Sequence, residues 1–292
     1  MMAPVPWTGP IVPPQGLDVT IPNVARIYDW LLGGKDNFAA DREAGQRLLA
    51  AVPDAAKAAR ANRAFLGRAV RFLAEEAGIR QFLDIGTGLP TQGNVHEIAQ
   101  ATDPRVRVVY CDNDPIVVTH ANALLANNLT VTASQADLRD PDFLFTLPLA
   151  HPLLDTSQPM AVLLVAVLHF LSDSEDPWAL VERIKWKLAP GSYVVISHVT
   201  GDEMPAESVR AAAEVYQGAS APGVTRSREE IARFFTGLDL VEPGLVEVSA
   251  WRPPPLDHRP RPAVLYAGIG RKAVPARQPL PGPNVSPDLH GD

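Results

Sequence analysis

The sequence predicts an α/β protein whose core is a doubly wound, mostly parallel sheet of seven strands ending in an antiparallel hairpin. Between residues 81 and 198, short apolar runs rich in β-branched residues alternate with segments whose apolar side chains recur at helical spacing. This alternation is typical of parallel strands joined by helices. Two further apolar stretches, residues 238–248 and 263–270, are joined by a proline-rich segment and indicate the hairpin.

The chain is long enough for such a core, since it has 292 residues of which 46% are hydrophobic. Residues 1–22 form a proline-rich arm and residues 272–292 a proline-rich tail, and we expect both to be irregular or disordered. Residues 1–16 lack the basic start and apolar segment of a secretion signal. The longest apolar run is shorter than the ~20 residues that span a bilayer, so no membrane segment is expected.

The N-terminal part, residues 23–78, is predicted to be a helical lid region that precedes the core, residues 79–271. Val24, Ile27 and Leu31 recur at helical spacing, and Gly33 and Gly34 then interrupt the pattern. Residues 23–51 therefore predict two short helices with a flexible joint. A longer helix is expected over residues 54–77, ending at Gly78.

Strands and helices of the core follow in turn. The expected parallel strands are residues 81–85, 106–111, 131–135, 161–167 and 193–198. The expected helices are residues 94–102, 115–127, 177–188 and 228–235. We expect residues 200–228 to line a substrate pocket together with the N-terminal helices.

The strongest local signal is the run Phe82-Leu83-Asp84-Ile85-Gly86-Thr87-Gly88, an apolar strand that enters a turn with two glycines. Such a turn lets the backbone approach a ligand at the carboxyl edge of the sheet. A dinucleotide site would need a third glycine where Thr91 stands, and its pyrophosphate would be repelled by the acid at position 84. S-adenosylmethionine carries a positive sulfonium and amino group and no phosphate, so that acid favours it. The alternative is that the acid only caps a turn.

A second acid, Asp112, ends the next strand 24 positions beyond Gly88. That spacing suits a carboxylate that accepts hydrogen bonds from both ribose hydroxyls of a nucleoside. Asp114 precedes Pro115 and is better explained as a helix N-cap.

A third acid, Asp137, follows the third strand and precedes Leu138. The carboxylate could accept a hydrogen bond from the exocyclic amine of adenine while the leucine packs on the ring. A solvated turn is the competing explanation, because Arg139 and Asp140 follow directly.

Together the three signals resemble the class I S-adenosylmethionine-dependent methyltransferases, which have a Rossmann-like fold. The resemblance covers residues 81–198 and reaches residue 270 if the hairpin forms. The run Pro22-Asn23-Val24-Ala25-Arg26-Ile27-Tyr28-Asp29-Trp30-Leu31-Leu32-Gly33-Gly34-Lys35-Asp36-Asn37-Phe38 is similar to the start of an actinobacterial family of such enzymes whose substrate is unassigned. The sequence Gly88-Leu89-Pro90 departs from the third glycine of many class I members and puts the loop shape in doubt.

The resemblance implies cofactor-binding roles for residues that follow the strands. They are Asp84, Gly86, Thr87, Gly88, Asp112, Asn113, Asp137, Leu138, Ala166 and Phe170. It also places His169 under the transferred methyl group, where an imidazole with a pKa near neutrality could be a general base. A packed or capping histidine is the alternative.

A lid over the cofactor is predicted for residues 28–38. Tyr28 offers apolar cover, Asp36 a partner for the amino group of the methionine moiety, and Lys35 a partner for its carboxylate. The alternative is that Tyr28, Trp30 and Phe38 pack permanently against the core and that Gly33 simply ends a helix.

The predicted function is methyl transfer from S-adenosylmethionine to a small molecule at O, N or C. A catalytically silent S-adenosylmethionine sensor is the rival, and a nicotinamide-dependent oxidoreductase is disfavoured by the incomplete glycine pattern. The net charge of −7 argues against nucleic acid as a partner, and the single cysteine fits a reducing cytoplasm. The dispersed histidines and lone cysteine predict no metal site. The acceptor and the oligomeric state stay open.

Overall fold

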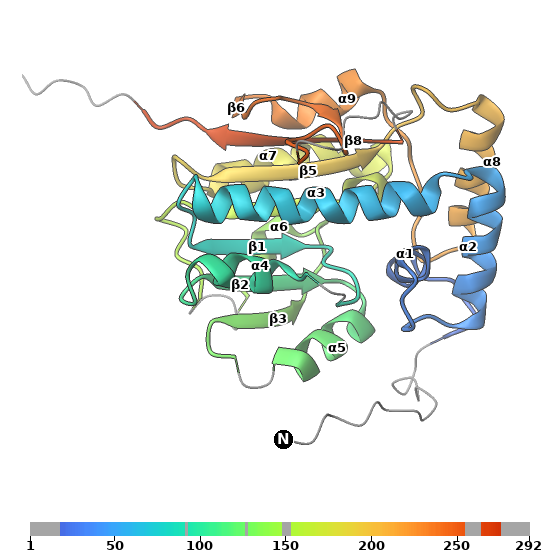
Figure 1. The fold of residues 1–292 in the computed structure, drawn as a ribbon, viewed down its shortest axis with the longest axis horizontal. Helices are drawn as coiled ribbons and strands as arrows, with labels where there is room; N and C mark the ends of the chain where they lie inside the picture. Colours follow the sequence, from blue (N-terminus) through green and yellow to red (C-terminus); the bar gives the residue numbers. More distant parts are fainter. Residues whose placement is uncertain (1–17, 91–92, 126–127, 148–152, 255–263, 276–292) are drawn as a thin grey trace, which may run out of the picture.

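The computed structural model describes residues 18–90, 93–125, 128–147, 153–254 and 264–275. Its centre is a sheet with the strand order β3-β2-β1-β4-β5-β8-β6 (Figure 1). The first five of these strands are parallel, and β8 lies antiparallel between β5 and β6. The strands are β1 (Gln81–Ile85), β2 (Arg107–Asp112), β3 (Val131–Gln135), β4 (Ala161–Val165), β5 (Tyr193–Val199), β6 (Leu238–Leu240), β7 (Val246–Glu247) and β8 (Leu265–Lys272). The predicted doubly wound α/β fold, which is Rossmann-like, is confirmed.

One predicted strand is divided. Residues 238–248 form β6 and β7, both of which pair with β8, so the described part of the sheet has eight strands rather than seven. Pro243 lies between them and has no N–H for the ladder, and Gly244 N donates to Val241 O at 2.8 Å to close a turn. The antiparallel end of the sheet is as predicted, although its strand is interrupted.

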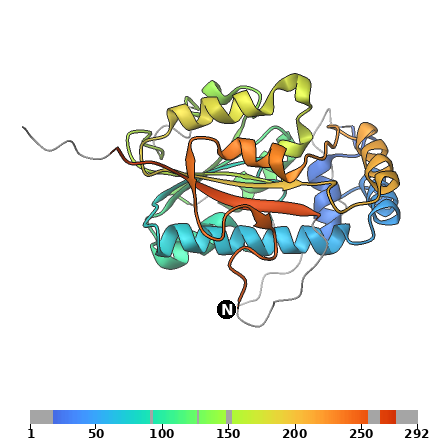
Figure 2. The same ribbon diagram turned by 90° about the horizontal axis from the view of Figure 1, so that it is seen from above.

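Helices cover both faces of the sheet (Figure 2). The helices α3 (Ala55–Glu75), α4 (Val95–Thr102) and α5 (Pro115–Leu125) contribute to one apolar cluster, and α6 (Pro141–Leu144), α7 (Pro177–Lys187) and α9 (Arg228–Ala232) to the other. Alternate strand residues supply the two clusters: Phe82 enters the first and Leu83 the second.

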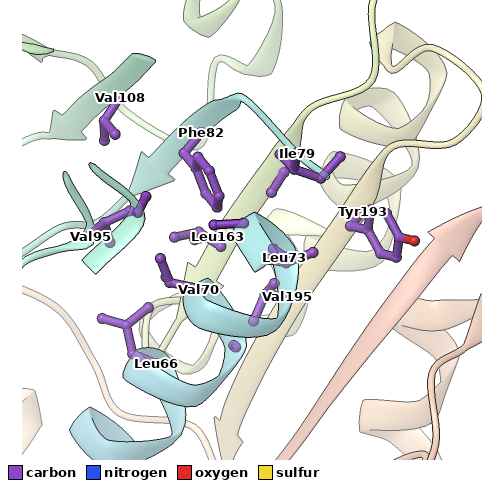
Figure 3. Packing of buried hydrophobic residues seen from close by; sticks show 14 of the residues in the cluster. Leu66, Val70, Leu73, Ile79, Phe82, Val95, Val108, Leu163, Tyr193 and Val195 are labelled. Atoms are coloured by element: carbon purple, nitrogen blue, oxygen red, sulfur yellow. The ribbon is translucent and has the colours of Figure 1, made fainter. Parts of the chain in front are cut away.

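The long helix α3 belongs to the core as well as to the N-terminal region. Its residues Leu66, Val70 and Leu73 are buried against Phe82 and Leu163 of the sheet (Figure 3). An apolar stripe at spacings of three and four residues explains this placement. The C-terminal half of α3 therefore fixes the N-terminal helices to the sheet.

Three helices gather at the carboxyl edge of the parallel strands (Figure 1). They are α1 (Val24–Leu32), α2 (Ala39–Ala51) and α8 (Ala206–Gln217), and they share an apolar cluster that includes Ile27, Leu48 and Val215. The predicted break between the first two helices is confirmed, since α1 ends at Gly33. The sequence patterns missed α8. No helix in the described ranges is long and apolar enough to cross a membrane.

A buried ion pair ties these N-terminal helices together. Asp41 of α2 accepts hydrogen bonds from Arg26 Nε and from the backbone N–H groups of Asn23 and Phe38, all at 2.8 Å. Arg26 Nη1 also lies 3.7 Å from Asp114 Oδ2 at the start of α5. Both members of the central pair are buried. Removal of one member leaves the other as an uncompensated buried charge.

We therefore expect Asp41→Ala to lower the free energy of unfolding by about 3–5 kcal/mol, the range for breaking a buried pair. Urea denaturation followed by circular dichroism would measure the change. Lys57→Ala, which removes an exposed ion pair with Asp54, is the control and should change stability little. Equal effects of the two substitutions would contradict a structural role for the Arg26–Asp41 pair.

Candidate functional site

A cavity of about 610 Å³ opens at the carboxyl edge of the sheet. The loops after β1, β2, β3 and β4 line it, and helices α1, α2, α3 and α8 enclose the other side. Between β1 and β4 the chain reverses the direction in which strands are added, which is where open α/β sheets bind ligands. The volume suits a small organic molecule.

The loop after β1 places a buried carboxylate beside the cavity. Asp84 is 5% exposed, and Thr87 Oγ1 donates to its Oδ2 at 3.0 Å. Burial raises the pKa of Asp84 to about 6, and the nearby charge of Asp112 acts in the same direction, whereas Arg63 opposes the shift. A cationic ligand would offset the cost of ionising this acid.

Two glycines shape that loop for different reasons. Gly86 has φ +69°, and a Cβ there would lie 2.4 Å from Val167 Cγ2, so this residue lets the loops after β1 and β4 meet. Gly88 has φ +67°, but a Cβ there would have no atom within 4 Å. The second glycine thus leaves open space on the cavity wall, as close approach of a ligand to backbone requires.

Asp112 joins the loops after β1 and β2. Its Oδ2 accepts a hydrogen bond from Gly88 N and its Oδ1 one from Asp114 N, each at 2.9 Å. Burial raises the pKa of this carboxyl. Each oxygen retains acceptor capacity, so ribose hydroxyls could still donate to it. The N-cap prediction is confirmed, since Asp114 Oδ1 accepts from Ile116 N at 2.8 Å.

The loop after β3 brings Asp137 and Leu138 to the cavity. Asp137 also forms the turn that was the competing explanation, because its Oδ1 accepts from Arg139 N at 2.9 Å. Its Oδ2 lies 3.4 Å from Asn113 Nδ2, and Asn113 lines the cavity too. Asp137 therefore both forms the turn and lines the cavity.

The strand β4 ends two residues before the predicted position. Ala166 has φ 58°, and its N–H donates to Ser197 Oγ at 2.9 Å. This left-handed conformation is strained for alanine, at a cost of about 1–3 kcal/mol, and the hydrogen bond helps to hold it. Ala166, His169 and Phe170 line the cavity.

His169 is buried in this segment, 6% exposed. Its Nδ1 has no hydrogen-bond partner among the described residues. Burial lowers the pKa of His169 to about 3, and the positive charge of Arg226 adds to the shift. The imidazole is therefore neutral at physiological pH and a weaker base than an ordinary histidine.

Residues 11–273 match the model of a protein family described as S-adenosyl methyltransferase. The chain belongs to this family. A solved structure from Thermobifida fusca YX, given provisionally as a methyltransferase, is 43% identical with a TM-score of 0.84, over 90% of this chain and 100% of that one. A DUF574 family protein from Streptomyces avermitilis is 42% identical with a TM-score of 0.83, over 87% and 99% of the two chains. No curated protein matches the sequence.

The methyltransferase therefore uses S-adenosylmethionine, and its cavity fits that cofactor. Two buried carboxylates, Asp84 and Asp112, suit a ligand with two positive charges and a ribose. The open space at Gly88 leaves room beside the backbone. In the described part of the methyltransferase, no group of three or more His, Cys, Asp or Glu side chains could hold a metal ion.

Of the residues predicted to form the lid, one lines the cavity and two do not. Tyr28 lines the cavity, and its hydroxyl donates to Ala59 O at 3.0 Å. Lys35 is exposed, and neither it nor Asp36 is among the described residues that line the cavity. The reason is Asp29, whose Oδ2 accepts from Asp36 N at 3.0 Å and from Asn37 Nδ2 at 2.8 Å and so holds this turn. The structure does not bring Lys35 and Asp36 to the site.

Sequence reasoning missed Asn62, Arg63 and Tyr216, which line the cavity from α3 and α8. Asn62 shares the apolar stripe of α3 with Leu66, four positions later, and is 2% exposed. A polar residue on a buried helix face was the available signal. For Arg63 and Tyr216 the decisive neighbours are distant in sequence.

We expect the affinity of the methyltransferase for S-adenosylmethionine to fall as the pH drops through about 6, the pKa of Asp84. Below that value the free protein holds a proton on this acid, which must leave before the carboxylate can face a cation. Calorimetry between pH 5 and 7.5 would measure the change. 5′-Methylthioadenosine lacks both positive charges and should show little pH dependence. A flat profile for S-adenosylmethionine would contradict this placement of charge.

Asp112→Ala should lower the affinity for both ligands at least tenfold, because charge-assisted hydrogen bonds are worth ~1.5–3 kcal/mol each. The substitution also frees the N–H groups of Gly88 and Asp114, so a lower melting temperature is expected. Equilibrium binding with both ligands checks the prediction. Unchanged affinity for 5′-methylthioadenosine would rule out a ribose contact.

Proposed function

We propose that this methyltransferase transfers the methyl group of S-adenosylmethionine to a small, uncharged and largely apolar molecule. The observation that carries the proposal is the composition of the cavity wall formed by α2 and the residue that follows it, by α8, and by the turn before α8. Its lining residues are all uncharged: Leu48, Val52, Met204, Ala212 and Tyr216. We call these five residues the acceptor chamber. A charged acceptor would lose its hydration there without a partner of opposite charge.

The charged lining residues belong to other elements. Asp84 and Asp112 follow β1 and β2, and Arg63 projects from α3. The cavity thus divides into a charged part that suits the cofactor and an apolar part that suits the acceptor. This division favours a catalytic role, and nothing in the comparisons supports a silent sensor.

Aromatic side chains lie where the two parts meet. The rings of Phe170 and Tyr216 are 5.5 Å apart in an edge arrangement, and the rings of His169 and Phe170 are 4.3 Å apart. S-adenosylmethionine supplies the methyl group from its sulfonium. The protein contributes by orienting the acceptor and excluding water, which are the main requirements of such a transfer.

His169 is the candidate for contact with the acceptor's nucleophilic atom. Its neutral ring could accept a hydrogen bond from a hydroxyl or amine of the acceptor, while its depressed pKa makes complete proton removal unfavourable. The positive charge of Arg226 favours the neutral state of His169. Arg226 is held next to this ring by the neighbouring His198, whose Nε2 lies 2.8 Å from Arg226 Nη1. We assign His169 a positioning role at an O or N acceptor, with C-methylation as the alternative.

The cover over the cavity is proposed to come from α1 rather than from the turn at residues 33–37. Tyr28 of α1 is held by hydrogen bonds to Ala59 and Asn62 of α3. Such fixed contacts support a permanent wall. We also propose that the enzyme works in the cytoplasm and that its acceptor is not a nucleic acid.

A pair of adjacent substitutions on α8 tests the acceptor chamber. Ala212→Glu would place a charge in the chamber, whereas Ala211→Glu alters a neighbour that is not among its lining residues. Both variants should bind S-adenosylmethionine normally. Only the first should reduce methyl transfer, by at least about tenfold, because an unpaired charge in an apolar site is costly.

Labelled S-adenosylmethionine and a metabolite extract of the source cells would supply the readout. We expect the label in a small molecule that partitions into organic solvent. Label in protein or nucleic acid, or equal transfer by both variants, would overturn the proposal.

A further inference from the structure

The cavity contains a positive charge without a carboxylate partner. Three described arginines line the cavity, and two of them pair with acids: Arg26 with Asp41, and Arg139 with Asp137 and Glu175. The third, Arg63 of α3, has no carboxylate within 4 Å among the described residues. A cation that faces a ligand cavity without a counter-charge is available to an anion.

The hydrogen bonds of Arg63 leave part of its guanidinium unused. Its Nη2 donates to Gly93 O and to Asn94 Oδ1, each at 3.2 Å. Its Nε is buried and has no partner among the described residues. A buried N–H donor without an acceptor is costly, so this atom needs a partner that the described residues do not supply.

Arg63 shares this region of the cavity with Asp84. Its charge lowers the pKa of Asp84 against the effect of burial, yet the two side chains form no direct ion pair within the described ranges. A positive and a negative group therefore face the same space without neutralising each other by contact. A ligand that carries both charges could meet both groups.

The amino-acid end of S-adenosylmethionine is such a zwitterion, with an ammonium and a carboxylate on one carbon. Lys35, the residue that the sequence offered for this carboxylate, lies outside the cavity lining. A guanidinium presents its N–H groups in a fixed fork that matches the two oxygens of a carboxylate. We infer that Arg63 binds the carboxylate of the methionine moiety through its free N–H groups, with Asp84 on the side of the ammonium.

The hydrogen bonds of Arg63 Nη2 to Gly93 and Asn94 hold the guanidinium in place. Asn94 precedes α4 and caps it, and Gly93 precedes Asn94. Arg63 thus connects helix α3 to the start of α4, directly after the glycine loop. The guanidinium is oriented before the ligand arrives, so less side-chain entropy is lost on binding.

Decarboxylated S-adenosylmethionine provides the test, because it keeps the sulfonium, the ammonium and the nucleoside and lacks only the carboxylate. The wild-type protein should bind S-adenosylmethionine between about tenfold and a hundredfold more tightly than the decarboxylated form. Arg63→Met should lose this preference, and Arg63→Lys should retain part of it. Arg60→Met, an exposed residue of the same helix, is the matched control and should behave as wild type.

Calorimetry with both ligands, alongside melting temperatures of the free proteins, gives the readout without any methyl transfer. The inference is overturned if the wild type binds both ligands equally, a result that does not depend on whether any variant folds. It is also overturned if Arg63→Met keeps the wild-type preference. Because no acceptor takes part, failure here would leave the proposed acceptor class untouched.

Discussion

The buried carboxylate of Asp112 is the interaction on which the ligand-facing edge of the sheet depends. It accepts backbone N–H groups from both sides, Gly88 in the loop after β1 and Asp114 at the start of α5. Without it, these two backbone N–H groups would lose their acceptor, and the two loops would lose their common anchor. Burial raises the pKa of Asp112, and the hydrogen bonds from the Asp114 and Gly88 N–H groups oppose that shift by favouring the carboxylate. The residue that would bind the ribose is thus also the residue that shapes its surroundings.

A second connection runs from the helical cover to the segment beneath the cavity. Asn62 Nδ2 donates to the Tyr28 hydroxyl at 2.9 Å, and Asn62 Oδ1 accepts from Ser197 Oγ at 2.6 Å. The same Ser197 oxygen accepts from the strained Ala166 N–H at 2.9 Å. One buried asparagine therefore couples α1 to the end of β4 through α3 and β5. This explains why a polar residue is retained on the apolar face of α3.

The sequence predicted the elements whose formation depends on local pattern. β1 and β3 have the predicted bounds, because their apolar runs are short and end at turn residues. The early end of β4 was not predictable, since nothing in the residue types around Ala166 demands its positive φ. The helix α8 was missed because most of it is exposed or half-buried, and only Val215 is fully buried. Its place is set by contacts with α2, which is distant in sequence.

For the site, the acids that follow the strands could be predicted, because the fold and their spacing bring them to the carboxyl edge of the sheet. The sequence did not predict Arg63, because α3 has twenty-one residues and several arginines. Which of them faces the cavity depends on how the helix is turned about its own axis against the sheet. The motif that predicts Lys35 as a ligand has structural contacts as well: Asp29 holds the turn, and Arg26 pairs with Asp41 of the next helix. The same motif therefore contributes both to the fold and, through Tyr28, to the cavity wall.

The distribution of charge also bears on how the product leaves. Asp84 and Asp112 are buried beside the cavity. Burial raises the pKa of both carboxyls, and the charge of Asp112 raises that of Asp84 further. A cationic sulfonium reduces that cost by attraction to both carboxylates, and the effect is larger in a partly buried site than in water. The product of methyl transfer has a neutral thioether in place of the sulfonium, so it would lack this attraction, although its ribose and amino-acid groups are unchanged. If both acids face the cofactor, as we infer from their place in the cavity lining, they would favour the sulfonium form over the thioether product.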